Sequence, residues 1–325
     1  MKNNTTTIEY IEDLHKKGIL PGPDGCTCGN KYLKIQKLSS KKYNFCFRCT
    51  KKKCKLYYPI RKKSFFENFT HLKIEDVMEV IKCNLCFKYN ITRAEKYLKE
   101  EKLININKCT IRKIYKKIRK SIYEYYLLQY ATDIFAEENT WEYFATDESL
   151  FTHIKGKQIW VLNIINTATK EFRIMVTLNR DTPNLKKFIT FFVPAGNNII
   201  TDKWSAYNFL NELGYRRVEH DHGRHDWGYG YESTSHSENI WNVLQSEIKQ
   251  TYRSIQNKDF FYILREAEFK YKNINRSNIE IINEFFDCYN LVFDFDSYGI
   301  EKDPDFLYYE DLEALFDDSS DDDSD

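Results

Sequence analysis

Residues 197–207 read NNIITDKWSAY, and the arrangement of this stretch decides how the sequence is interpreted. Ile199 and Ile200 predict a short buried strand, and a helix-like pattern, KWSAYNFLNEL, begins directly after Asp202. A carboxylate at the end of a buried strand is costly unless it is paired. Two explanations stay open at this point: Asp202 caps the following helix, as aspartates often do, or it serves a functional site.

The segments around this stretch alternate between strand and helix patterns. Three segments rich in β-branched and aromatic residues precede it, FATDESLF, KQIWVLNIINT and EFRIMVTLN. A helical pattern, TPNLKKFITFF, separates them from the strand that ends at Asp202. A polar, His-rich connection, VEHDHGRHDWGYGYESTS, follows, and helices are predicted from about Ser235 to Thr251 and over 258–273.

Two further acids occupy comparable positions. Asp147 lies within a strand-like stretch, and Glu238 lies in the first turn of a predicted helix, where Ser235 and Glu238 can alternatively form a capping box. The succession of elements is the layout of an RNase H-like nuclease fold, in which three such acids meet. Three adjacent carboxylates need compensation, and Mg²⁺ or Mn²⁺ ions supply it while activating phosphodiester cleavage. This pattern predicts Asp147, Asp202 and Glu238 as ligands of catalytic Mg²⁺ or Mn²⁺. Glu148, next to Asp147, is expected to be solvated or structural.

The charges are strongly segregated although the formal net charge is only +1. Residues 1–132 contain 30 Lys and Arg against 12 Asp and Glu, whereas residues 301–325 contain 1 against 12. A basic first part favours binding to a polyanion such as nucleic acid, with solvated charged faces as the alternative.

The chain has no apolar run of membrane-spanning length and no signal-peptide core at its start. We therefore expect the protein to work inside a cell and not to bind a membrane.

Five of the nine cysteines fall between residues 26 and 54. In a cell interior such a cluster predicts a metal site rather than disulfides. Two pairs of thiols flanking a small β module suit a structural Zn²⁺ ion, and free thiols in a small core are the alternative. The spacing is irregular, so we predict that four of the five bind zinc: Cys26, Cys28, Cys46, Cys49 and Cys54.

Residues 71–130 are predicted to be helical throughout. TRAE, from Thr92 to Glu95, predicts a capping box, and Thr110 predicts the cap of a second helix with apolar residues at helical spacing. Two short helices of which the second is basic are typical of a helix-turn-helix, although an ordinary solvated helix face is the alternative. The residues expected to bind DNA from this helix are Arg112, Lys113, Lys116, Lys117 and Lys120.

Several motifs resemble those of DDE transposases, specifically the Merlin superfamily and its bacterial ISXO-type relatives. ATDESLF, TDKWSAY and ENIWNVLQSEIK are similar to the three catalytic motifs of the family, and 36 residues separate Asp202 from Glu238. PIRKKSFFEN and LREAEFKYKNINR also resemble family blocks. The chain departs from the family where STSHSE replaces a His-Thr-Asn-like run before Glu238.

The resemblance implies an enzyme that binds terminal inverted repeats in double-stranded DNA, cleaves DNA with Mg²⁺ or Mn²⁺, and joins the 3′-ends to target DNA. The catalytic residues are then Asp147, Asp202 and Glu238, with Trp241 beside them as a DNA contact. Two alternatives stay open for His220 and His222: one of them lies near the cut phosphate, or both belong to an ordinary His-rich surface loop. Such enzymes act as homo-oligomers. The alternative is a domesticated or inactive relative that only binds DNA.

The fold class predicted is an α/β RNase H-like catalytic domain preceded by a small zinc ribbon and an all-α helix-turn-helix module, with a disordered acidic C-terminal tail. The predicted segments are a zinc-ribbon-like module over 1–65, a DNA-binding region over 66–132, the catalytic domain over 133–280 and a C-terminal extension over 281–325. The tail is expected to bind partners or to screen the basic first part. We expect a nuclear location in a eukaryotic host and a cytoplasmic one otherwise.

Overall fold

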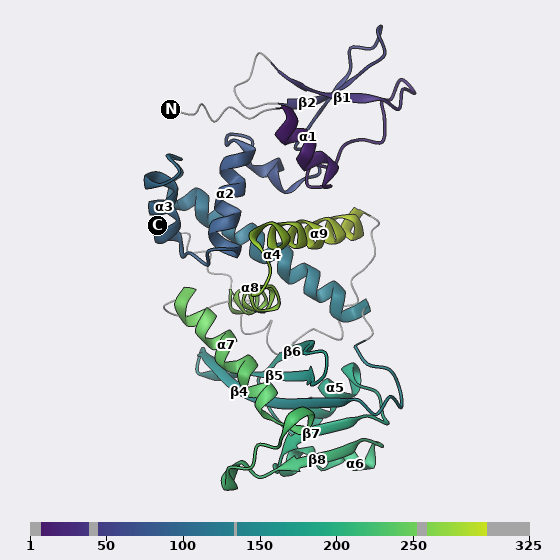
Figure 1. Cartoon of the computed structure of the whole chain (residues 1–325), viewed down its shortest axis with the longest axis vertical. Coiled ribbons are helices and arrows are strands. Elements are labelled where there is room, and N and C mark those ends of the chain that lie inside the picture. The colour runs from purple at the N-terminus through teal and green to yellow at the C-terminus, as the bar shows by residue number, and fades with distance from the viewer. Residues whose placement is uncertain (1–7, 39–44, 133–134, 252–258, 298–325) are drawn as a thin grey trace. The chain divides into compact units, whose positions relative to one another are not determined.

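The computed structural model describes residues 8–38, 45–132, 135–251 and 259–297. They divide into two compact units (Figure 1). The first unit combines the described residues of 1–125 with those of 272–301, and the second is built on 126–271. These units divide the chain differently from the four predicted segments, because part of the predicted C-terminal extension belongs to the first unit. The predicted acidic tail lies outside the described residues.

The first unit contains a small antiparallel sheet that carries two of the five clustered cysteines, Cys46 and Cys49. Its strands are β1 (Leu33–Lys37), β2 (Phe45–Cys49) and β3 (Tyr57–Pro59), in the order β1-β2-β3. Helix α1 (Ile8–Lys16) packs near β1, and the ring of His15 meets Phe47 edge-on at 4.8 Å. The apolar core beneath this sheet is small, so the sheet needs an additional stabilising element.

The other elements of the first unit are helical. They are the 3₁₀ helix η1 (Phe65–Phe69), α2 (Ile74–Leu85), α3 (Ile91–Glu100), α4 (Lys108–Thr132) and α9 (Asn278–Ser297). Aromatic rings from η1 and α9 pack together in the core. The ring centroid of Phe65 lies 5.5 Å from that of Phe285, and the ring centroid of Phe66 lies 5.8 Å from that of Phe286. The sequence analysis did not predict α9.

The caps predicted for α3 and α4 are wrong by a few residues. Asn90, not Thr92, caps α3, since its side chain accepts a hydrogen bond from the backbone N–H of Arg93. Asn107 accepts from the N–H of Thr110 over 2.8 Å, so α4 begins before Thr110. In both cases an asparagine just ahead of the predicted cap takes the role, for which asparagine is well suited.

The second unit is built on a five-stranded mixed sheet in the order β6-β5-β4-β7-β8. The strands are β4 (Tyr143–Ile154), β5 (Lys157–Asn166), β6 (Phe172–Thr177), β7 (Asn198–Asp202) and β8 (Arg216–His220). The first three pair antiparallel, whereas β7 and β8 continue the sheet in parallel with β4. This is the element order expected of an RNase H-like fold.

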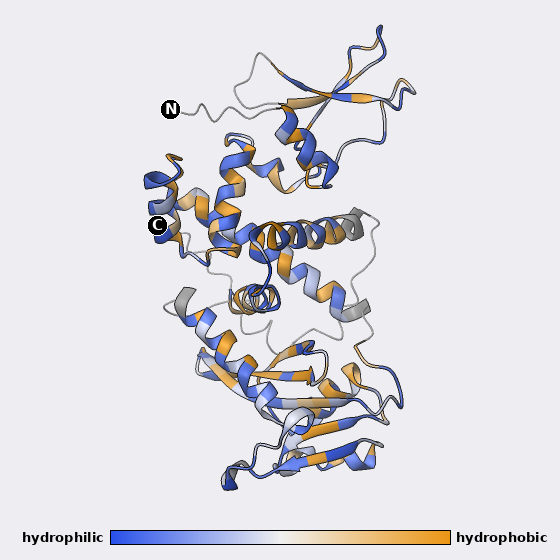
Figure 2. Ribbon diagram, in the orientation of Figure 1, coloured by the Kyte–Doolittle hydropathy of each residue, from blue (hydrophilic) through white to orange (hydrophobic). Residues whose placement is uncertain are grey.

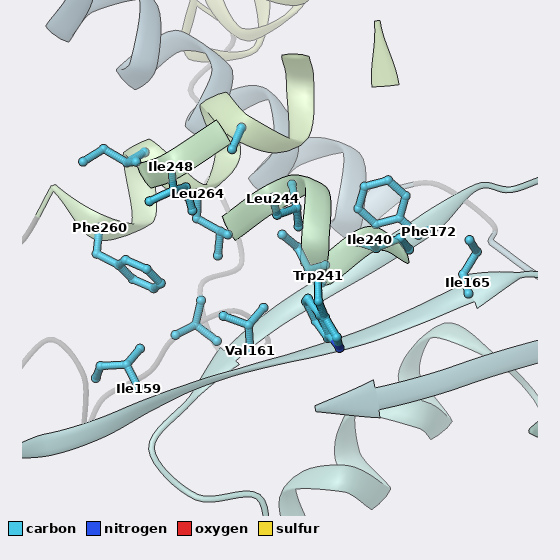
Figure 3. Close-up of a cluster of buried hydrophobic side chains, with 14 of the residues drawn as sticks. Ile159, Val161, Ile165, Phe172, Ile240, Trp241, Leu244, Ile248, Phe260 and Leu264 are labelled. Carbon is cyan, nitrogen blue, oxygen red and sulfur yellow. The ribbon is translucent and has the colours of Figure 1, made fainter. Parts of the chain in front are cut away.

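Helices cover both faces of this sheet. Helix α5 (Thr182–Phe192) packs on β5 and β6, and α7 (Ser235–Thr251) packs on β4 and β5. Side chains of α7 and α8 (Phe260–Lys272) form one apolar cluster with the strands, as Figure 3 shows for Val161, Ile240 and Leu244. We call the sheet face that contributes Ala145, Val161 and Ile200 to this cluster the α7 face.

Two differences from the sequence prediction concern the edge of this sheet. The start of the His-rich connection belongs to strand β8, which was missed because only Val218 among its residues is apolar. Figure 2 colours the ribbon by hydropathy. The predicted helix after Asp202 is a 3₁₀ turn, η2 (Ser205–Tyr207), followed by the single turn α6 (Phe209–Glu212).

None of the helices in the described part of the chain combines the length and apolarity needed to cross a membrane.

Candidate active site and metal centres

Two adjacent parallel strands carry the predicted catalytic aspartates. Ala145 of β4 is paired with Ile200 of β7, and Asp147 and Asp202 each follow two residues later. Because side chains alternate between the faces of a strand, both aspartates lie on the α7 face, like Ala145 and Ile200. Neighbouring strands lie about 4.8 Å apart, so the two carboxylates project side by side.

Helix α7 presents Glu238 over the same sheet face. Ile240 and Leu244 are buried against the strands, which fixes the first turn of the helix above β4 and β5. The indole of Trp241 is buried, and its Nε1 donates a hydrogen bond to Oδ2 of Asp147 over 3.0 Å. The structure therefore brings Glu238, Asp147 and Asp202 to one place, with Trp241 bonded to one of the acids.

The pKa of Asp147 responds to burial and to both other acids. Burial raises it to about 6, and the charges of Asp202 and Glu238 raise it as well. The bond from Trp241 acts in the opposite direction. A buried carboxyl that feels the charge of two other acids is a candidate ligand for a cation.

Two buried polar atoms beside the acids fit a metal site with bound water. Asn163 is paired with Asp147 across β4 and β5, and its Nδ2 donates to the carbonyl of Ser237 over 3.2 Å. Oδ1 of Asn163 and Oγ of Ser237 are both buried and lack a hydrogen-bond partner among the described residues. Such atoms generally mark an ion or ordered water. The sequence analysis missed Asn163, although a lone amide within the apolar run IWVLNII was a usable signal.

Asp202 makes a local contact, but it is not the cap of the following helix. Its Oδ1 accepts a hydrogen bond from the backbone N–H of Trp204 over 2.9 Å. Trp204, not Asp202, occupies the N-cap position of η2, and its side chain makes no capping bond. The contact with Trp204 occupies one oxygen of Asp202 and leaves the other for a ligand.

Glu148 points to the opposite sheet face and is not solvated. Its side chain is 5% exposed, accepts a hydrogen bond from the hydroxyl of Tyr207 over 2.7 Å, and pairs with Arg180 over 3.2 Å. Burial raises its pKa to about 7. The structure thus separates the adjacent acids Asp147 and Glu148 into two different environments.

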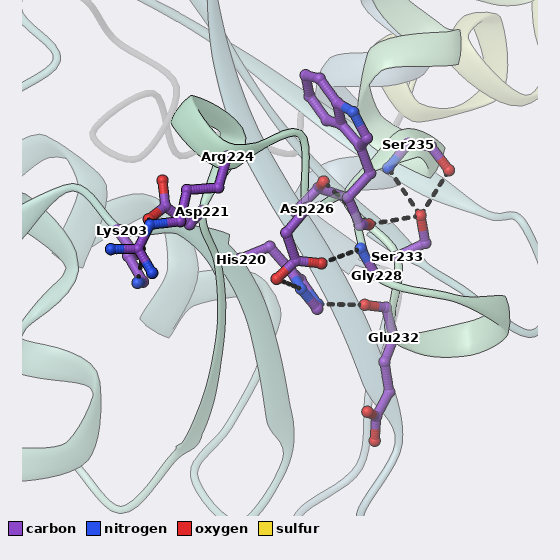
Figure 4. Close-up of polar contacts among 11 residues, drawn as sticks. Lys203, His220, Asp221, Arg224, Asp226, Gly228, Glu232, Ser233 and Ser235 are labelled. Carbon is purple, nitrogen blue, oxygen red and sulfur yellow. Dashed lines mark hydrogen bonds and ion pairs between the residues drawn. The ribbon is translucent and has the colours of Figure 1, made fainter.

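The loop between β8 and α7 is pinned by His220 (Figure 4). His220 is paired with Asp202 across β7 and β8, so both lie on the α7 face. Its Nε2 lies 2.6 Å from the carbonyl of Glu232, and its Nδ1 lies 3.4 Å from Oδ2 of Asp226. Gly228 packs so closely, with φ +70°, that a Cβ there would lie 2.3 Å from the carbonyl oxygen of Glu232. The side chain of His222 is not described.

Four of the five clustered cysteines come together. Within the described residues, Cys26, Cys28, Cys49 and Cys54 form the group of ligand atoms that lie within 4.8 Å of one another. Sγ of Cys26 is 3.6 Å from that of Cys54, and Cys28 and Cys49 show the same separation. Zn–S bonds of about 2.3 Å in a tetrahedron require about 3.8 Å between sulfurs. The four thiols therefore fit zinc, whereas Cys46 lies outside the group, buried within β2.

Hydrogen bonds favour the thiolate form of two of these cysteines, Cys26 and Cys49, whereas burial and the neighbouring thiols raise the pKa of Cys54 to about 12. Tyr58 donates to Sγ of Cys26 and is the main reason that the pKa of this thiol falls to about 6. Nδ2 of Asn30 donates to Sγ of Cys49 over 3.3 Å and lowers its pKa. Thiolates are the form in which cysteine binds metal. Neither Asn30 nor Tyr58 was singled out from the sequence.

The predicted DNA-binding residues differ in their accessibility. Arg112, Lys113, Lys116 and Lys120 are exposed on α4. Lys117 instead donates to the carbonyl of Phe65 over 2.9 Å and lies over aromatic rings, and burial lowers its pKa. Its placement does not fit a DNA contact, and neither does that of Trp241, because the Trp241 ring is buried and engaged with Asp147.

Part of the second unit resembles a known protein family. Residues 149–272 match the family described as ISXO2-like transposase domain, which confirms the predicted resemblance to ISXO-type transposases. The matched segment includes Asp202 and Glu238 and begins two residues after Asp147. None of the curated proteins matches the chain in sequence.

Among solved structures, three viral chains are similar to this chain. A chain of the simian T-cell lymphotropic virus intasome, in complex with PP2A regulatory subunit B56 gamma, is 14% identical over 40% of this chain and 48% of its own, with a TM-score of 0.29. The HTLV-2 integrase catalytic core domain in complex with magnesium is 12% identical in its dimeric form, over 43% of this chain and 86% of its own, with a TM-score of 0.28. Its trimeric form is 11% identical over the same shares, with a TM-score of 0.27.

Proposed function

We propose that this protein is a DDE transposase that binds terminal inverted repeats and catalyses metal-dependent DNA cleavage and strand transfer. The observation that carries the proposal is the convergence of Asp147, Asp202 and Glu238 from two adjacent parallel strands and the first turn of α7. The match of residues 149–272 to a transposase domain supports the same reaction class.

Asp147, Asp202 and Glu238 would hold Mg²⁺ or Mn²⁺, which activates water or a 3′-hydroxyl and stabilises the leaving oxygen in phosphodiester cleavage. The four cysteines have ligand atoms within 4.8 Å of one another, and the three acids do not form such a group among the described residues. Carboxylates that serve two ions must be spaced over a wider site than four thiolates around one ion. Trp241 orients Asp147, and Asn163 holds the first turn of α7 against β5.

The first unit supplies DNA binding in this proposal. Zinc on Cys26, Cys28, Cys49 and Cys54 would hold the small sheet together. The exposed cations of α4 would contact phosphates, with α3 and α4 serving as the helix-turn-helix. The protein would act as a homo-oligomer on repeat and target DNA, in the nucleus of a eukaryotic host or otherwise in the cytoplasm.

The test uses purified protein and a duplex carrying the inverted repeats that flank its gene. Cleavage at the repeat end is followed with Mn²⁺ for the wild type, for Asp202→Asn and for Asp181→Asn. Asp181 is exposed and caps α5, a role that asparagine fills equally well, so this variant is the matched control.

End-specific cleavage by the wild type and by Asp181→Asn, with loss in Asp202→Asn, supports the proposal. Specific binding of the repeat without cleavage by any of the three proteins contradicts it. That outcome favours a transposase-derived DNA-binding protein, in which Asp202 is only the partner of the Trp204 N–H.

A further inference from the structure

Arg180 is held by three elements at once. It lies between β6 and α5, and its guanidinium carbon is 4.3 Å from the ring centroid of Trp160 and 4.9 Å from that of Trp204. Nη1 pairs with Oε1 of Glu148 over 3.2 Å. Stacking on aromatic rings and a carboxylate partner leave the planar guanidinium little freedom to turn.

The anchor beneath Arg180 is itself fixed. Glu148 is 5% exposed and receives a second hydrogen bond, on its other oxygen, from buried Tyr207. The Arg180 side chain, in contrast, remains 46% exposed. An arginine that is oriented from the buried side and open on the other has donors available for a ligand.

The open side of Arg180 faces a hollow that also contains Asp202. This hollow has a volume of about 310 Å³ and is lined by Arg180, Asp202, Lys203, Trp204, Asp221 and Gly223. Lys203 supplies a second cation, which pairs with Asp221 over 3.3 Å (Figure 4). A planar guanidinium binds the oxygens of a phosphate group through two parallel hydrogen bonds, and a lysine adds a point charge.

We propose that Arg180 binds a backbone phosphate of the DNA strand that is cut, in the hollow beside Asp202. This inference rests on the proposed function, because it places the strand at Asp202. Arg180 is then a substrate-binding residue that sets the position of the strand relative to the acids, and Glu148 is the residue that positions Arg180. Phosphate contacts of this kind fix register without reading sequence.

The experiment replaces single phosphates near the cut with uncharged methylphosphonates. Binding of each end duplex is measured with Ca²⁺ in place of Mn²⁺, over a range of salt concentrations, and cleavage is measured separately with Mn²⁺. Wild type is compared with Arg180→Ala, with Arg180→Lys and with Lys186→Ala, which removes an exposed cation of α5 outside the hollow. The double variant Arg180→Ala/Glu148→Gln removes both partners of the ion pair, so that a folding defect caused by an unpaired carboxylate is recognised.

We expect one methylphosphonate position to weaken wild-type binding by about fivefold and to have no effect on Arg180→Ala. Arg180→Ala should reduce the slope of log affinity against log salt by about one. Arg180→Lys should retain the slope but lose most of the difference in affinity between the phosphate and methylphosphonate duplexes. Lys186→Ala should behave as the wild type at this position.

An unchanged methylphosphonate profile in Arg180→Ala and in the double variant overturns the inference, even if the wild type cleaves DNA. If no protein cleaves DNA, the proposed function fails, and the binding measurements with Ca²⁺ still decide whether Arg180 holds a phosphate.

Discussion

The four-cysteine cluster and the three-acid site are both suited to metal ions, but the protein prepares them in opposite ways. In the cluster, the donors Tyr58 and Asn30 lower the pKa of Cys26 and Cys49. At the acids, burial raises the pKa of Asp147 to about 6, and the neighbouring carboxylates add to the shift. Two of the thiols receive hydrogen bonds that favour their charged form, whereas burial disfavours the charged form of Asp147.

This difference indicates what each site is for. A closed group of four thiolates satisfies the full coordination of a structural zinc ion and leaves no position for a substrate. Acids that are held near one another without compensating cations tend to destabilise the protein and are retained for chemistry. Loss of a ligand should therefore affect folding at the first site and catalysis at the second.

The largest effect is expected from loss of zinc. Cys49→Ser should abolish zinc binding and unfold the three-stranded sheet, because a structural zinc ion contributes on the order of 10 kcal/mol to folding. Metal analysis should find about one zinc per chain in the wild type, and circular dichroism should report the loss of strand signal. Cys46→Ala is the control, since Cys46 lies outside the cluster. Zinc retained at full occupancy in Cys49→Ser would contradict the assignment.

At the acid site we expect the reverse pattern. Glu238→Gln should reduce Mn²⁺-dependent cleavage by about a thousandfold or more, as for other residues that act as a catalytic unit. Its melting temperature without metal should stay the same or rise, because one charge that opposes ionisation of Asp147 is removed. Exposed Glu171 provides the matched control, Glu171→Gln. A clear fall in the melting temperature of Glu238→Gln, but not of Glu171→Gln, would contradict the expectation that loss of an acid affects catalysis and not folding.

A smaller effect should follow from changing the donor to Asp147. Trp241→Phe keeps an aromatic ring against Phe151 but removes the Nε1–H bonded to Asp147. The Mn²⁺ concentration needed for half-maximal cleavage should rise by about tenfold, the typical result of losing a partner that orients a metal ligand. Trp141→Phe, at an exposed tryptophan, should leave the Mn²⁺ dependence unchanged. The same dependence in both variants would show that the indole N–H does not orient Asp147.

The smallest effect concerns two neighbouring lysines of α4. Lys116 is exposed, whereas Lys117 is engaged by the carbonyl of Phe65. Lys116→Ala should weaken DNA binding by about two- to threefold and reduce the salt slope by about one. Lys117→Met, which keeps the buried stem, should leave DNA affinity unchanged. Fluorescence anisotropy over a range of salt concentrations distinguishes them, and equal losses would mean that Lys117 also reaches DNA.

The second unit was largely predictable because its strands have strong local signals. Apolar, β-branched runs identify β5 and β6, and Asp202 stands where such a run ends, whereas Asp147 lies within β4. The edge strand β8 was not predictable in this way, because strands at an edge are partly solvated and need no apolar run. The helix α9 was missed because its predicted segment was assigned to a C-terminal extension.

The supporting residues of both sites were harder to find than the ligands. Asn163, Arg180 and Tyr58 act through contacts between segments that are distant in the sequence. Such contacts follow from strand register and from the packing of helices, which residue types and spacing do not specify. Which four of the five cysteines come together was equally hard to predict, because Cys46 differs from its neighbours only in the direction in which its side chain leaves β2.

The division of the chain has a consequence for the order in which the protein is made. The second unit is inserted into the first, which resumes near residue 272. Phe285 and Phe286 of α9 complete the aromatic core around Phe65 and Phe66. On the ribosome, this core must wait until more than two hundred further residues, up to Phe286, have been synthesised, while the second unit can already fold. A fragment that ends near residue 125 would therefore lack part of its own interior, and a fragment meant to fold as the first unit must include α9.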